Sequence, residues 1–134
     1  IAMKKILLTL TALLLFSACN TTTVQDPAET ANNYQAAIAA EKDIFLDFYA
    51  PWCTICRANQ PHIEDAITEE QNSNLVLIQI DYDSDTEMRA RFDIFQQSMY
   101  VYIPNGNEEE ARVIGPGIFK KDTFLEFIQG NLAD

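Results

Sequence analysis

The 134-residue sequence has few basic side chains. Nine Lys and Arg stand against 20 Asp and Glu, which gives a net charge of −11 at pH 7. No basic stripe appears along the chain, so nucleic acid is a poor partner for its surface. The sequence also lacks repeats, low-complexity segments and any apolar run close to the roughly 20 residues that cross a bilayer. What remains is enough chain for one small acidic domain with its own core.

Cysteine is also scarce, and two of the three residues stand together in Trp52-Cys53-Thr54-Ile55-Cys56. The pair lies between an apolar run and a predicted helix. With the first cysteine at a helix N-terminus, one sulfur can be held as a reactive thiolate while the other closes a small disulfide onto it. A metal site and a structural bridge are the alternatives. The loop closed by such a bridge is too small to stabilise the fold much, which favours a chemical role.

The third cysteine follows an N-terminal segment that is typical of a secretory signal. Lys4 and Lys5 precede an apolar run over 6–16, and small residues lead up to Cys19. This pattern predicts a signal peptide over residues 1–18. Cleavage elsewhere nearby, which would leave Cys19 as a spare thiol, is the alternative.

Phe16-Ser17-Ala18-Cys19 resembles the lipobox of bacterial lipoproteins. The resemblance implies that Cys19 carries lipid and becomes the mature N-terminus, anchored at an extracytoplasmic or periplasmic membrane face. Asn20 in the next position implies the outer membrane in a Gram-negative organism. We expect a lipidated N-terminus and flexible tether over 19–32, because this stretch is polar and without periodicity, and a folded domain over 33–134.

Hydrophobic periodicity and turn signals predict the elements of that domain. Pro104-Asn105-Gly106-Asn107 indicates the turn of an antiparallel hairpin, and Pro61 should kink the helix that contains it. The order gives a small α/β domain with a mixed sheet. The expected elements are helices over 33–42, 53–71, 86–92 and about 122–132, and strands over 44–49, 75–82, 99–103 and 111–114.

A strand that runs directly into Trp-Cys-x-x-Cys resembles the thioredoxin superfamily. The resemblance rests on the segment 48–53, on Asp47 in the preceding strand, on Pro61 and on Gly115 at the end of the last strand. It implies a thioredoxin-like fold, with a mixed central sheet of about four strands flanked by helices. The segment 111–115 and the helix after it are most similar to the periplasmic reductase domain of transmembrane thiol–disulfide interchange proteins.

The resemblance also implies roles for individual residues. Cys53 is the candidate nucleophile and Cys56 the resolving cysteine. Asp47 interrupts an apolar strand; if it is buried its pKa should be raised, which suits a proton acceptor for Cys56, whereas an Asp47 at a wet strand edge would have no such role. Trp52 is expected as a surface lid beside the disulfide, with packing alone as the other interpretation.

The loop that contains Gln97 and Ser98, where the resemblance places substrate docking, departs from the family pattern. The family has a cis-proline at the position of Ser98, preceded here by Gln97. Without proline a cis bond costs about 2.5–4 kcal/mol, so we expect Gln97–Ser98 to be trans. Gln97 and Ser98 are therefore candidate substrate-binding residues with an altered geometry.

The leading hypothesis is a membrane-anchored, extracytoplasmic thiol–disulfide oxidoreductase. It would reduce protein disulfides, need no cofactor and draw electrons from a membrane protein. An alternative is a module in which Cys53 and Cys56 bind copper or another soft metal, with Met99 or His62 as a further ligand. A third possibility is a thioredoxin-like adaptor whose cysteines are idle.

Overall fold

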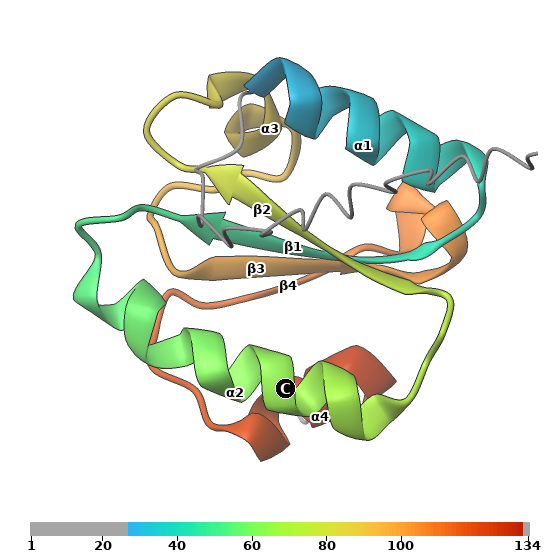
Figure 1. Ribbon diagram of the computed structural model, residues 1–134. Coiled ribbons are helices and arrows are strands. Elements are labelled where there is room, and N and C mark those ends of the chain that lie inside the picture. The colour runs from blue at the N-terminus through green and yellow to red at the C-terminus, as the bar shows by residue number, and fades with distance from the viewer. Residues whose placement is uncertain (1–26, 133–134) are drawn as a thin grey trace, which may run out of the picture.

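The computed structural model describes residues 27–132, in which a four-stranded sheet lies between two layers of helices (Figure 1). The helices α1 (Pro27–Ala39) and α3 (Thr86–Arg91) cover one face of the sheet. The helices α2 (Thr54–Glu70) and α4 (Lys121–Gln129) cover the other. This arrangement confirms the predicted α/β class.

The sheet is mixed, as the sequence predicted. Its strands are β1 (Asp43–Tyr49), β2 (Leu75–Asp81), β3 (Met99–Ile103) and β4 (Arg112–Ile114), in the order β2-β1-β3-β4. β1 pairs in parallel with β2 and antiparallel with β3, and β3 pairs antiparallel with β4. The expected hairpin is therefore present, although its connection consists of two short 3-10 helices, Pro104–Gly106 and Glu108–Glu110, where a simple turn was expected.

β1 is an inner strand with helices on both faces, so its side chains are buried in alternation on the two sides. Ile44, Leu46 and Phe48 enter the core under α1 and α3. Phe45 enters the core under α2 and α4, where it contacts the rings of Phe124 and Phe127. This strand carries the polypeptide from the middle of the core to the start of α2.

The first helix differs most from expectation. It begins at Pro27 rather than at residue 33 and ends at Ala39 rather than at residue 42. Proline is well tolerated in the first turn of a helix, and Thr30 and Tyr34 bury their side chains against the domain. Residues 27–32 of the expected tether are therefore helical. The expected signal peptide, Cys19 and the rest of the tether lie outside the described residues.

The other boundaries agree within a few residues. Pro61 lies inside α2, as predicted, and Gln71 ends that helix with a left-handed backbone. α4 stops at Gln129 rather than near residue 132 because Gly130 adopts φ 74° there. None of the helices in the described part of the chain combines the length and apolar character needed to cross a membrane.

Candidate active site

The two cysteines lie where β1 ends and α2 begins (Figure 1). They form a disulfide with a Cα–Cα distance of 5.3 Å. Cys53 is the N-cap of α2, and its Sγ accepts a hydrogen bond from the backbone N–H of Cys56 at 3.1 Å. The same N–H would stabilise a Cys53 thiolate in the reduced protein, together with the positive end of the helix dipole.

The two cysteines differ in exposure. Cys53 is 4% exposed, whereas Cys56 is fully buried. Ala50 is buried beside them, and Tyr49, Ile55 and Tyr82 pack against the pair. A partner can therefore reach Cys53 first, and Cys56 can act only from inside the protein.

Asp47 is fully buried in the middle of β1, as the sequence predicted. Burial raises the pKa of Asp47 from its ordinary value of 3.8 to about 6, although hydrogen bonds from Gln79 and Gln60 oppose the rise. Gln60 donates to Oδ2 at 2.5 Å and Gln79 donates to the same oxygen at 3.2 Å. Oδ1 has no hydrogen-bond partner among residues 27–132. A carboxyl with this pKa can exchange a proton near neutral pH.

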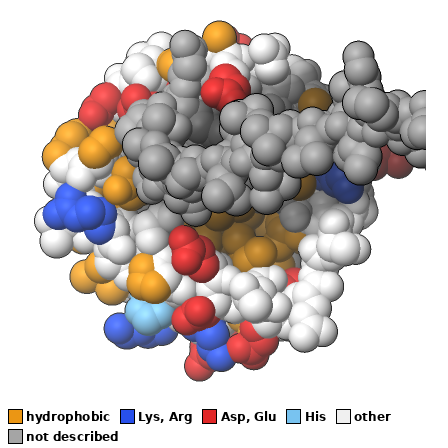
Figure 2. All heavy atoms as spheres, in the orientation of Figure 1, with side chains coloured by type: hydrophobic (Ala, Val, Ile, Leu, Met, Phe, Trp, Pro, Cys, Tyr) orange, Lys and Arg blue, Asp and Glu red, His pale blue; other side chains and the backbone are white. Residues whose placement is uncertain are grey.

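Trp52 is 58% exposed beside the disulfide, which agrees with the expected position at the surface. Its Nε1 donates to Asp83 Oδ2 at 2.7 Å. Arg57 donates to the carbonyl of Pro51 at 2.5 Å and so holds the turn that leads into α2. Figure 2 shows hydrophobic side chains at the surface on the left of the view, the end of the molecule at which α2 begins.

The structure buries Ser98 and leaves Gln97 partly exposed. The bond between them is trans, as expected, because the one cis peptide bond within residues 27–132 joins Gly115 to Pro116. Ser98 adopts φ 64°, donates its N–H to the carbonyl of Phe48 at 3.0 Å, and donates its hydroxyl to the carbonyl of Gly117 at 3.0 Å. The Ser98 side chain thus holds the loop together and does not point to solvent.

Gly115 follows β4 and faces this loop. A Cβ at position 115 would lie 2.5 Å from the carbonyl oxygen of Ser98, and the φ of 101° is a conformation that side chains rarely adopt. The close approach of the two backbones explains why glycine stands at this position.

Asn59 is a site residue that the sequence analysis missed. It is fully buried on α2, and its Nδ2 lies 2.8 Å from Tyr100 OH, 2.8 Å from the Gly117 carbonyl and 3.3 Å from Ser98 Oγ. Its Oδ1 accepts the backbone N–H of Phe119 at 3.0 Å. Asn59 therefore ties α2 to the loop before β3 and to the loop between β4 and α4. Its spacing of three from Cys56 and four from Ile63 places it on the buried face of the helix, a signal that was available in the sequence.

Two further surface residues near these loops were also missed. Phe95 is 70% exposed, and its carbonyl accepts a hydrogen bond from Tyr82, which packs against the cysteines. Ile118 is also exposed and follows Gly117. Like Trp52, both are large apolar side chains exposed to solvent.

The residues suggested as further metal ligands do not join the cysteines. Met99 is buried in the core under α1 and α3, and His62 lies partly exposed on α2. Within residues 27–132 no group of three or more His, Cys, Asp and Glu side chains is placed to hold a metal ion. The soft-metal alternative gains no third ligand from this arrangement.

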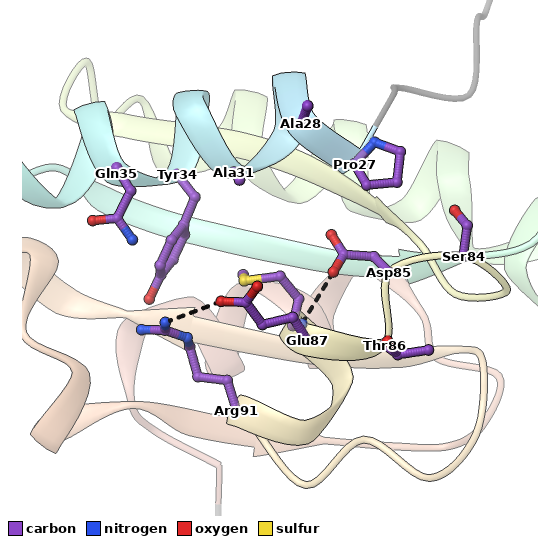
Figure 3. Close-up of a pocket in the computed structure, with 11 residues that line it drawn as sticks. Pro27, Ala28, Ala31, Tyr34, Gln35, Ser84, Asp85, Thr86, Glu87 and Arg91 are labelled. Atoms are coloured by element: carbon purple, nitrogen blue, oxygen red, sulfur yellow. Dashed lines mark hydrogen bonds and ion pairs between the residues drawn. The ribbon is translucent and has the colours of Figure 1, made fainter.

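A cavity of about 330 Å³ lies between α1 and α3, away from the disulfide (Figure 3). Tyr34 points from α1 toward Arg91 of α3, and both side chains bind Glu108 Oε1, at 2.5 Å and 3.1 Å respectively. Burial and the adjacent Glu108 carboxylate raise the pKa of Tyr34. None of the candidate catalytic residues lines this cavity.

Comparison with known proteins identifies the class. The sequence profile of the thioredoxin family matches residues 25–130, so the chain belongs to that family. Thioredoxin of Rickettsia bellii is 24% identical over 98 residues, which cover 73% of this chain and 90% of the relative. Protein disulfide-isomerase of Gallus gallus is 27% identical over 84 residues, which cover 61% of this chain and 16% of that longer protein.

Solved structures agree on the fold. Chloroplastic thioredoxin z superposes with a TM-score of 0.61 at 22% identity and covers 75% of this chain and 88% of its own. Trxlp from Edwardsiella tarda superposes with a TM-score of 0.60 at 18% identity and covers 72% of this chain and 91% of its own. With its Cys53–Cys56 pair the chain is a thiol–disulfide oxidoreductase of the thioredoxin family.

Proposed function

We propose that this oxidoreductase reduces protein disulfides at an extracytoplasmic membrane face, to which a lipid on Cys19 anchors it. The observation that carries the thiol–disulfide exchange chemistry is the asymmetric cysteine pair. Cys53 lies at the N-terminus of α2, where its Sγ accepts a hydrogen bond from the backbone N–H of Cys56, while Cys56 is fully buried. Relatives named thioredoxin and protein disulfide-isomerase support a disulfide-containing protein as substrate.

The proposed reaction has two sulfur transfers. The Cys53 thiolate attacks a disulfide of the partner, forms a mixed disulfide and releases one partner thiolate. Cys56 then attacks Cys53 Sγ, which forms the internal disulfide and releases the second partner thiolate. The proton of the Cys56 thiol goes to the carboxylate of Asp47, whose raised pKa suits it as an acceptor.

The partner would dock on the surface around the disulfide. Trp52 and the partly exposed Gln97 offer side chains there, and Phe95 adds apolar area. Ser98 contributes by holding the loop, because its N–H and hydroxyl are both bonded inside the protein.

The site of action is proposed from the N-terminal sequence. The segment 1–18 supports export, and the resemblance of Phe16-Ser17-Ala18-Cys19 to a lipobox supports lipidation, with Asn20 favouring an outer membrane in a Gram-negative cell. Disulfides persist in such compartments, so a reductase there needs an electron donor, for which we propose a membrane protein. Incorporation of a labelled fatty acid that is lost in Cys19→Ala would support the anchor, and equal labelling of both proteins would refute it.

Trapping tests the activity directly. In a Cys56→Ala variant the mixed disulfide cannot resolve, so partners should remain bound through Cys53 on non-reducing gels and be identified by mass spectrometry. The matched control is Cys53→Ala/Cys56→Ala, which should trap nothing. A lack of trapped protein in Cys56→Ala would refute the proposal, and a redox potential of about −120 mV rather than about −270 mV would refute the reductase direction.

A further inference from the structure

Two glutamine side chains hold one oxygen of the Asp47 carboxyl group. Gln60 reaches it from α2 at 2.5 Å, and Gln79 reaches it from β2, where it is the registered neighbour of Asp47, at 3.2 Å. Both amides donate to Oδ2. Oδ1, equally buried, accepts no hydrogen bond from the described residues. The two oxygens are therefore not equivalent.

This difference decides where a proton can sit. An oxygen that already faces two amide N–H donors has no free direction for a proton of its own, because N–H groups only donate. A proton on Oδ1 meets no such conflict. We infer that Gln60 and Gln79 are positioning residues, which direct the proton taken from Cys56 to Oδ1 and stabilise the carboxylate so that the proton can leave again. This inference rests on the proposed role of Asp47.

Apart from the two amides, no side chain described around Asp47 stabilises its carboxylate. No Lys, Arg or His within residues 27–132 contributes to the pKa of Asp47, which burial raises and the two amides lower. Tyr100 faces Asp47 from β3, and burial together with the Asp47 charge raises the pKa of Tyr100 to about 12. Tyr100 thus remains neutral while Asp47 titrates. The cysteines carry no proton as a disulfide, and in the reduced protein Cys56 supplies one.

The proton balance of the resolving step follows. The S–H bond of Cys56 breaks as its sulfur bonds to Cys53 Sγ, and the proton moves to Asp47 Oδ1. The bond between Cys53 and the partner breaks at the same time, and the partner leaves as a thiolate. When an external dithiol later reduces the internal disulfide, Asp47 can return the proton to Cys56.

The test uses Gln60→Met and Gln79→Met, which keep side-chain length and lose the donor. Each reduced protein carries Cys19→Ser, so that Cys53 and Cys56 are its only thiols. It is mixed with an aromatic disulfide that releases a coloured thiolate at each of two steps, and the second release reports the attack by Cys56. The rate of that release is followed against pH. Gln129→Met is the matched control, because exposed Gln129 also donates to a carboxylate oxygen, that of Glu70 at 2.9 Å.

In the plot of the second release rate against pH, one limb reports the ionisation of Asp47. We expect the midpoint of this limb to rise by about one pH unit in each glutamine variant, which corresponds to a tenfold gain in the proton affinity of Asp47. In Gln129→Met the midpoint should stay in place. In an Asp47→Asn background the same glutamine variants should leave the profile unchanged. Infrared titration of the carboxyl group in the oxidised proteins gives a second measurement, in which the midpoint near 6 should rise likewise.

The outcomes distinguish the positioning role of Gln60 and Gln79 from the proposed role of Asp47 as the proton acceptor. The inference is overturned if the infrared midpoint and the kinetic limb both stay in place in the glutamine variants. This holds even where Asp47→Asn removes the limb and so supports the role of Asp47. A uniform rate loss at all pH values, with no movement of the limb, also overturns it, because that result describes a purely structural role. A limb that survives in Asp47→Asn overturns the proposed role of Asp47 and the inference with it.

Discussion

The burial of Asp47 should make the stability of the folded protein depend on pH. The pKa of Asp47 is about 6 in the fold against an ordinary 3.8, so the folded state holds the proton more tightly than the unfolded chain. This contribution to stability is fully present below about pH 3.8 and is lost as the pH rises through about 6. At about 1.4 kcal/mol per pKa unit, the loss at neutral pH is about 3 kcal/mol.

Asp47→Asn isolates this effect, because asparagine does not titrate. We expect the free energy of unfolding of the variant, relative to the wild type, to rise by about 3 kcal/mol between acidic and neutral pH. The measurement is urea unfolding of the two oxidised proteins at a series of pH values, with the disulfide intact so that neither Cys53 nor Cys56 titrates. Asp65→Asn, at an exposed position of α2, is the matched control. A stability difference that is flat across the range, or that falls with pH, would refute the reasoning.

Three further changes test the packing and the surface around the disulfide. Asn59→Ala removes the donor to Tyr100 and the acceptor of Phe119, so urea unfolding should show a loss of about 3 kcal/mol; a loss below about 1 kcal/mol would contradict the network. Gly115→Ala forces a Cβ against the backbone and should cost about 2 kcal/mol or more in the same assay, so a neutral result would contradict the close approach. Trp52→Phe, at an exposed position, should change stability by no more than about 0.5 kcal/mol. It should raise the apparent KM for a protein disulfide and leave the rate with a small aromatic disulfide unchanged. Equal effects on both substrates would argue against docking at Trp52.

Local patterns in the sequence were sufficient for most of the fold. The apolar strands, the Pro104-Asn105-Gly106-Asn107 turn and the proline inside α2 carry signals within a few neighbouring residues, and each element formed close to its expected place. The start of α1 was missed, although its signal is also local: Asp26 precedes Pro27, and Glu29 follows Asp26 by three residues, which is typical of a helix N-terminus. The packing of Thr30 and Tyr34 against the rest of the domain adds to this signal and is not visible in the sequence.

The site was predictable where one residue type identifies the chemistry. Two cysteines and an acid within an apolar strand are visible in any reading of the chain, and burial of Asp47 followed from its neighbours. The partners of those groups were not visible. Gln60 and Gln79 meet on Asp47 from two different elements, and only the register of β1 with β2 brings Gln79 opposite it. Such contacts depend on tertiary structure that no local pattern specifies.

An ionised side chain that weakens the fold needs a compensating role, and the Asp47→Asn protein can show whether it has one. At neutral pH this variant should be the more stable protein, because the wild type carries the cost of the buried carboxylate. If Asp47 accepts the proton of Cys56, the same preparation should release the second coloured thiolate about a hundredfold more slowly. Urea unfolding and the two-step release assay measure both quantities side by side. A variant that gains stability and resolves at the wild-type rate would show that Asp47 has no part in the sulfur chemistry.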